Sequence, residues 1–131
     1  MAHDIIADPG SILPRSGAVG NYAAVTAAPV TETIPGNGAE SVELIINVSV
    51  LTATQTLTVT ISGVDVFGNS YVLLASAAIA ATGITRLRVT PWLASSANAI
   101  AQDLLPEKFT VSYVLNNGLS LSFTVSATLF P

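Results

Sequence analysis

The chain contains no cysteine and only one histidine, His3, among its 131 residues. Without cysteine it can form neither disulfide bonds nor thiolate metal sites. One histidine cannot build a zinc site. A hydrolytic triad needs a histidine held by a rigid scaffold, and we do not expect such a scaffold around His3, at the third position of the sequence. The sequence therefore predicts no catalytic residues, no metal, no cofactor and no enzymatic activity.

Charge is also scarce. Charged residues make up 9% of the chain, whereas about 25% is usual for a globular domain. The net charge is -4, and the four basic residues form no stripe that could neutralise several phosphates. No apolar run approaches the roughly 18 residues of a membrane-spanning helix, and the first residues do not read as a secretory signal. We therefore expect neither nucleic acid nor a membrane as a partner.

A surface with so few charges is rich in Ser, Thr, Asn and Ala, and two interpretations fit it. In one, copies of the chain or a different partner cover much of the surface, because interfaces are depleted in charged residues. In the other, the chain is a Thr-rich β-protein with a polar, uncharged exterior. Composition alone leaves both open.

From about residue 41 to 131, apolar and polar residues alternate almost without interruption, which predicts half-buried β-strands. Between them lie turns such as Pro35-Gly36-Asn37-Gly38. We expect an all-β fold: a single β-sandwich of seven or eight strands, immunoglobulin-like or jelly-roll. The expected strands are 23–34, 41–51, 56–62, 71–79, 84–90, 108–115 and 119–130.

Two segments differ from this body. Residues 1–22 hold irregularly spaced Pro and Gly and predict an extended N-terminal arm, which leaves 23–131 as the sandwich domain. The arm carries two apolar pairs that could dock on a neighbouring molecule, Ile5 with Ile6 and Ile12 with Leu13. Residues 94–105, between Pro91 and Pro106, predict a long connection that crosses between sheets, with room for one helical turn.

Details within the body can also be predicted. Pro29 suits an edge strand, and Gly63 breaks the alternation as a β-bulge would. For the last two strands, a three-residue loop with Gly118 in the left-handed conformation pairs Val111 with Phe123 and matches every apolar residue with another. The expected core face of this hairpin is Phe109, Val111, Tyr113, Leu121, Phe123 and Val125.

Few residues could carry chemistry. Asp65 and Asn69 flank a turn and could give calcium two ligands, although a carboxylate at a turn more often binds its own backbone. The remaining carboxylates form no glycosidase motif. Trp92 is the only tryptophan, and we expect it to be buried beside Pro91 rather than to form a sugar-binding platform.

Arg86 and Arg88 share one face of an expected strand. They could be solvent-facing charges that protect an edge against aggregation. Alternatively, they could bind Glu40 or Glu43 of a neighbouring subunit, because the planar guanidinium binds carboxylates bidentately.

Several segments resemble small structural proteins of tailed bacteriophages and prophages. The resemblance covers about residues 41–131 and consists of strand-and-turn patterns rather than catalytic signatures. It lies in LTVTISGVD (57–65), GNSYVLLASAAIAATG (68–83), TRLRVTP (85–91), ANAIAQDLLP (97–106) and FTVSATLFP (123–131). The resemblance implies a virion protein, with capsid decoration (cement) as the best-fitting role.

On this basis we expect a protein that binds the outside of a phage capsid and stabilises it, with the major capsid protein as its partner. The resemblance implies a homotrimer. The long apolar pattern of 119–130 suggests an open edge that another copy would cover. The alternatives are a tail or neck component and a carbohydrate-binding or adhesion module.

Overall fold

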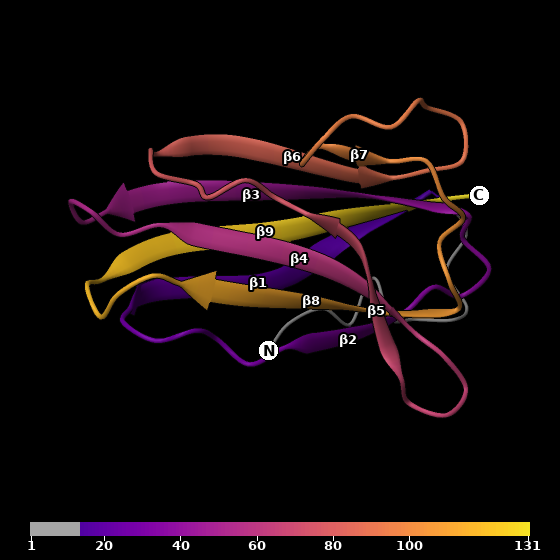
Figure 1. Ribbon diagram of the computed structural model, residues 1–131, viewed down its shortest axis with the longest axis horizontal. Coiled ribbons are helices and arrows are strands. Elements are labelled where there is room, and N and C mark those ends of the chain that lie inside the picture. Colours follow the sequence, from indigo (N-terminus) through magenta and orange to yellow (C-terminus); the bar gives the residue numbers. More distant parts are fainter. Residues whose placement is uncertain (1–13) are drawn as a thin grey trace.

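Residues 14–131, the part of the chain that the computed structural model describes, form nine strands and no helix. Two sheets pack face to face as a sandwich (Figure 1), which confirms the all-β prediction. The strands are β1 (Arg15–Val25), β2 (Glu32–Pro35), β3 (Ser41–Leu51), β4 (Leu57–Val64), β5 (Ser70–Ala75), β6 (Gly83–Val89), β7 (Ile100–Ala101), β8 (Lys108–Leu115) and β9 (Leu121–Phe130).

The five-stranded sheet has the order β1-β9-β3-β6-β7, and the four-stranded sheet has the order β2-β8-β4-β5. All pairs are antiparallel except β6 with β7. β9 and β3 are central strands of the first sheet, and β8 and β4 are central in the second. Consequently β9 is covered by β1 and β3, and the expected open edge at 119–130 is wrong.

The core lies between the sheets and follows the alternation of the sequence. In β4, Leu57, Val59 and Ile61 are buried and the threonines between them are partly exposed. β3 buries Val42, Leu44, Ile46 and Val48 in the same way. Each such side chain stabilises the fold by roughly 1.5–3 kcal/mol through its burial. Strict alternation along 41–51 would bury Val50 as well, but Val50 is exposed, because a register shift between Val48 and Val50 reverses the alternation.

The N-terminal boundary of the domain was predicted at residue 23, which is too far along the chain. β1 begins at Arg15, and its residues 15–22 pair with β9 as part of the sandwich. Val19 and Tyr22 are core residues. Gly17, Ala18 and Gly20 hid the alternation because they carry little or no side chain. The expected strand 23–34 is instead the end of β1, a loop containing Pro29, and β2.

For the last two strands, the predicted core face is correct and the predicted pairing is wrong. All six predicted core residues of 109–125 are buried, but β8 and β9 lie in different sheets. Their apolar faces meet across the sandwich instead of side by side, an arrangement that matches apolar residues equally well. The loop between them is held by Gln55, whose amide nitrogen donates to the carbonyl oxygens of Asn117 (3.0 Å) and Leu119 (2.6 Å). Gly118 is not among the residues with positive φ.

Two further expectations have clear outcomes. The bulge predicted at Gly63 lies instead on β5, where Leu73 is the extra residue between the pairs Ile61–Leu74 and Ser62–Val72. Gly63 keeps its register, and its missing side chain makes room for the Tyr71 ring, since a Cβ there would lie 2.4 Å from Tyr71 Cζ. Residues 94–105 contain no helix; they form the short parallel strand β7 and then cross to the second sheet, as predicted.

Candidate functional site

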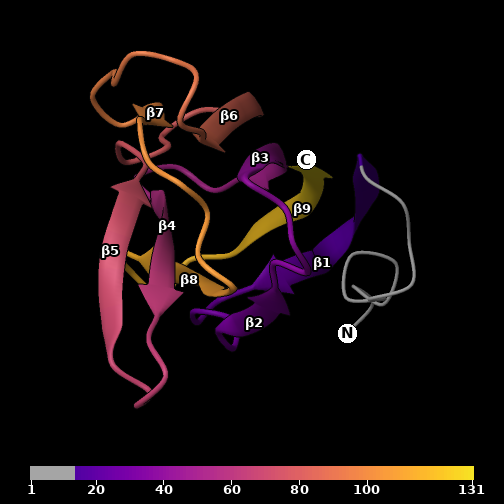
Figure 2. The same cartoon turned by 90° about the vertical axis from the view of Figure 1, so that its right-hand side faces the viewer.

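Several loops of residues 14–131 converge at the end of the sandwich where β9 finishes, which we call the β9 end. Ser41 pairs with Phe130, Val42 pairs with Val89, and the Leu105 N–H donates to the Glu40 carbonyl oxygen at 2.9 Å. Figure 2 looks onto this end: the β4–β5 hairpin extends on one side of it, and the β6–β7 loop lies on the opposite side. The exposed aromatic side chains of the described residues, Phe67, Tyr71 and Trp92, all lie at or next to this end.

The β4–β5 hairpin presents two apolar side chains at its tip. Val66 is 91% exposed and Phe67 is 87% exposed. The turn is fixed by Asp65, whose Oδ1 accepts hydrogen bonds from the backbone N–H groups of Phe67 (2.8 Å) and Asn69 (2.9 Å). Its Oδ2 accepts a third from Asn69 Nδ2 at 3.0 Å. The tip is therefore an ordered apolar projection.

The same hydrogen bonds bear on the hypothesis that Asp65 and Asn69 bind calcium. The Asn69 backbone N–H, followed by the Asn69 side chain, lowers the pKa of Asp65 below its ordinary value, because both donors favour the carboxylate. The carboxylate thus binds its own turn, and no group of three or more His, Cys, Asp or Glu side chains in residues 14–131 is placed to hold a metal ion.

Beside the hairpin, a groove of about 920 Å³ extends to the 35–39 turn.

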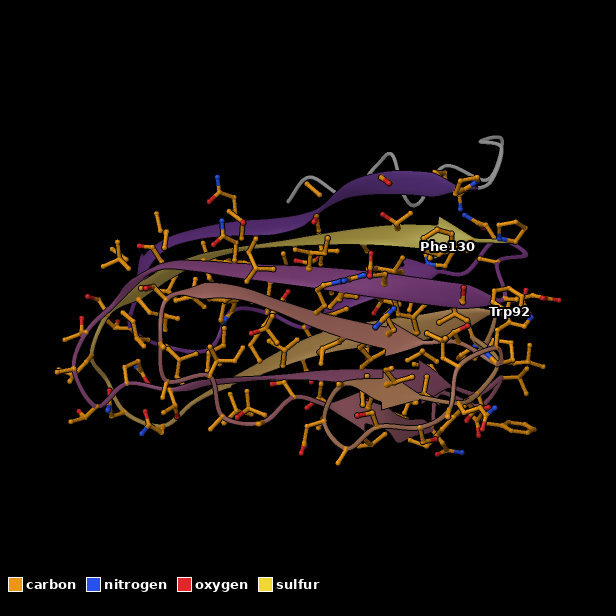
Figure 3. The ribbon with its side chains drawn as sticks, turned by 90° about the horizontal axis from the view of Figure 1, so that it is seen from above. Trp92 and Phe130 are labelled. Carbon is orange, nitrogen blue, oxygen red and sulfur yellow. The ribbon has the colours of Figure 1, made fainter. Side chains whose placement is uncertain are left out.

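A second groove lies at the β9 end of the first sheet, on its outer side. It has a volume of about 530 Å³, and we call it the Trp92 groove. Figure 3 shows Phe130 at the end of β9 and Trp92 beyond the end of β6, at the same end of the molecule. Glu43 from β3 and both arginines from β6 line it, and Leu93, Thr90 and Pro131 contribute to its walls.

The exposure of Trp92 corrects the expectation that it would be buried. The side chain is 58% exposed, because β6 ends at Val89 and Pro91 directs the chain away from a core already filled by Leu87 and Val89. The base of its loop is nevertheless held: Thr90 N–H donates to Ala101 O at 3.0 Å, and Trp92 N–H donates to Thr90 Oγ1 at 3.3 Å. The groove therefore has an aromatic wall on an ordered support.

The two arginines predicted as interface residues have different environments. Arg86 forms an ion pair with Glu43 of the same chain, and its Nε donates to Glu43 Oε2 at 2.9 Å. Glu43 thus pairs with Arg86 of its own chain, and a contact of either arginine with Glu40 or Glu43 of a neighbouring subunit stays a prediction. Arg88 is half-buried in the groove, and within residues 14–131 its guanidinium has no hydrogen-bond or ion-pair partner.

The remaining predicted interface residues, Ile5, Ile6, Ile12 and Leu13, lie outside the described residues, as does His3. Sequence reasoning missed Trp92, Val66 and Phe67 as exposed residues. The available signal was their position, since Trp92 follows Pro91, and Val66 and Phe67 precede Gly68, outside the alternating segments. No helix of residues 14–131 is long and apolar enough to span a bilayer.

Inside the core, two tyrosine hydroxyls form a polar pair. Tyr22 O–H donates to Tyr113 Oη at 3.5 Å, and both rings pack on Phe123. Burial raises the pKa of Tyr113 well above its ordinary value, with smaller contributions from Tyr22 and Glu32. The pKa of Tyr22 is raised for the same main reason. The pair is enclosed, so we assign it to stability rather than to a site.

No family model matches the chain, and no curated protein matches it. It is similar to a chain in the structure of infectious bursal disease virus Gt strain, at 17% identity and a TM-score of 0.39, over 92% of this chain and 34% of that one. For the Gx strain of the same virus the values are 17%, 0.42, 92% and 33%. This chain therefore spans about a third of the length of those chains, and at these TM-scores the likeness carries no argument about its role.

Proposed function

We propose that this chain is a structural protein of a bacteriophage virion, and most specifically a decoration protein that binds the outside of the capsid and stabilises it. Its mechanism is binding alone, with the major capsid protein as partner, and the working form is a homotrimer. Support comes from the resemblance of residues 41–131 to small phage structural proteins and from a surface with unusually few charges.

The observation that carries the proposal is the apolar tip of the β4–β5 hairpin. Val66 and Phe67 are almost fully exposed, and the hydrogen bonds to Asp65 order the turn that carries them. An ordered aromatic beside a groove is the usual anchor of a protein–protein interface. Many copies on a shell would add up to strong attachment even if each contact is weak.

The test is binding to empty shells of the phage that carries the gene, measured by co-sedimentation and by locating the protein in particle density. A Val66→Ser, Phe67→Ser double variant should lose binding while it keeps its fold. Val30→Ser is the matched control, because Val30 is 81% exposed but lies in the β1–β2 loop at the opposite end.

The outcomes separate the proposed roles. Saturable addition at lattice sites on empty shells supports decoration. Density only in the tail or neck of complete particles would assign the alternative structural role. Absence from purified particles would overturn the virion proposal.

A further inference from the structure

We propose that the Trp92 groove is a binding site for an acidic saccharide, a sugar that carries a carboxylate. The inference uses residues on the side of the β9 end away from the β4–β5 hairpin, and it does not depend on the virion role. It rests on the exposed Trp92 ring, the Arg86–Glu43 pair, the size of the groove and an Arg88 guanidinium that has no partner within residues 14–131.

The groove combines apolar walls with few polar groups. Trp92, Leu93 and Phe130 supply apolar surface, and β3 and β6 supply the charged groups Glu43, Arg86 and Arg88. A volume of about 530 Å³ falls within the range of small-molecule sites, about 300–1,000 Å³. A sugar ring has an apolar C–H face that stacks on an aromatic ring and hydroxyls that need hydrogen-bond partners at its rim, so its chemistry fits this division.

The ion pair supplies the hydrogen-bond partners for hydroxyls. Glu43 Oε2 accepts from Arg86, which holds both planar groups in place. Glu43 Oε1 is left as an acceptor, and the outer edge of the Arg86 guanidinium is left as a donor. Neighbouring hydroxyls of a sugar can use one of each.

Arg88 determines the charge of the ligand. Its half-buried guanidinium has no carboxylate partner among residues 14–131, and a partly desolvated cation gains most from an anion that binds it through two hydrogen bonds. A carboxylate on the saccharide provides that anion. A peptide fits less well, because β3 is paired on both sides with β9 and β6 and the groove offers it no free strand edge.

The experiment uses Trp92 as its own reporter, since it is the only tryptophan in the chain. The full chain is titrated with sialyllactose and with trigalacturonic acid while tryptophan emission is followed, and calorimetry gives the affinity. Lactose is the neutral probe, and a short Asp/Glu peptide is the peptide probe. We expect saturable binding of at least one acidic saccharide and much weaker binding of lactose.

Arg88→Gln should weaken the affinity for the acidic saccharide by about 10-fold or more, since one charge-assisted contact is lost. It should leave the affinity for lactose unchanged. Trp92→Ala should abolish binding in calorimetry. Phe67→Ala, an exposed aromatic outside the groove, is the matched control and should bind like the wild type. If Trp92→Ala fails to fold, the titration of Arg88→Gln still tests whether the groove binds an acidic saccharide.

The proposal is overturned if neither acidic saccharide changes the emission or gives heat at millimolar concentration. It is also overturned if the peptide binds more tightly than both saccharides, or if Arg88→Gln binds as the wild type does.

Discussion

Three aromatic residues join the two sheets within the core, near the start of β9. Tyr22 from β1 and Phe123 from β9 come from one sheet, and Tyr113 from β8 comes from the other. Their ring centroids lie 4.9 to 5.4 Å apart, within the range of favourable aromatic contacts. Phe123 is fully buried and in contact with both tyrosines, so its loss would leave a gap between the two sheets.

Phe123→Ala should therefore lower the free energy of unfolding by roughly 3–5 kcal/mol, the usual cost of deleting a buried aromatic ring. Thr124→Ala is the control on the adjacent residue, because Thr124 lies on the exposed face of β9. Its cost should stay below about 1 kcal/mol. Urea unfolding of both variants measures the difference, and equal costs would mean that a partner covers the outer face as well.

The tyrosine pair predicts a pH dependence. Burial raises the pKa of Tyr113 and Tyr22 above the ordinary value of 10.0, so the unfolded chain loses these protons at lower pH than the native protein. This contribution to stability is complete below pH 10 and is lost as the pH rises above it. Urea unfolding from about pH 8 to about pH 11 should show the fall, with a shallower slope for Tyr113→Phe. The same slope in both proteins would contradict the assignment.

At the scale of the element, β1 protects β9. It pairs along most of β9, from Arg15–Leu129 to Val25–Leu121, and brings Val19 and Tyr22 into the core. Gly20 lies close to the Tyr22 ring, where a Cβ would come within 2.2 Å of the hydroxyl. β1 is thus a fitted edge strand and not a detachable arm.

Deletion of residues 1–20 should consequently destabilise the protein and promote aggregation, because it removes half of β1 and exposes the backbone of β9. Deletion of residues 1–13 leaves β1 whole and serves as the control, and we expect it to remain folded. Thermal unfolding and light scattering distinguish the two truncations. An unchanged midpoint after deletion of 1–20 would show that β1 adds nothing to the fold.

The elements also show what the sequence could predict. Alternation indicates which side of a strand is buried, and the inner faces of β3, β4, β6, β8 and β9 follow it, except at Val50 of β3, which is exposed. It does not fix the neighbouring strand: Val111 and Phe123 were matched as cross-strand partners, but their strands lie in different sheets. The loops were the least predictable, since the exposure of Trp92 depends on where Pro91 directs the chain after β6. The Arg86–Glu43 pair needed the β3–β6 register, which joins residues far apart in the sequence.

For the whole molecule, the sheet edges determine how copies can associate. β2 carries Glu32 and Pro35, β7 has only two residues, and β1 is interrupted by two register shifts. β5 (SYVLLA) has no charged residue, and Tyr71 and Val72 are exposed on it. Proteins usually protect edge strands with charge, proline or irregularity, and β5 has only the bulge at Leu73. It is therefore the edge best suited to contact another copy.

Sedimentation at micromolar concentration tests the proposed homotrimer, which should appear at about 40 kDa, three times the 13.4 kDa of one chain. Closed cyclic symmetry would cover each β5 without continued growth, with interfaces on the order of 1,000 Å² or more. Val72→Lys, which puts a charge on this edge, should shift the protein to monomer. Val114→Lys is the matched control, because Val114 is also exposed (59%, against 67% for Val72) but lies on the central strand β8. A monomeric wild type would overturn self-association and leave a single chain that finds its partner on the shell.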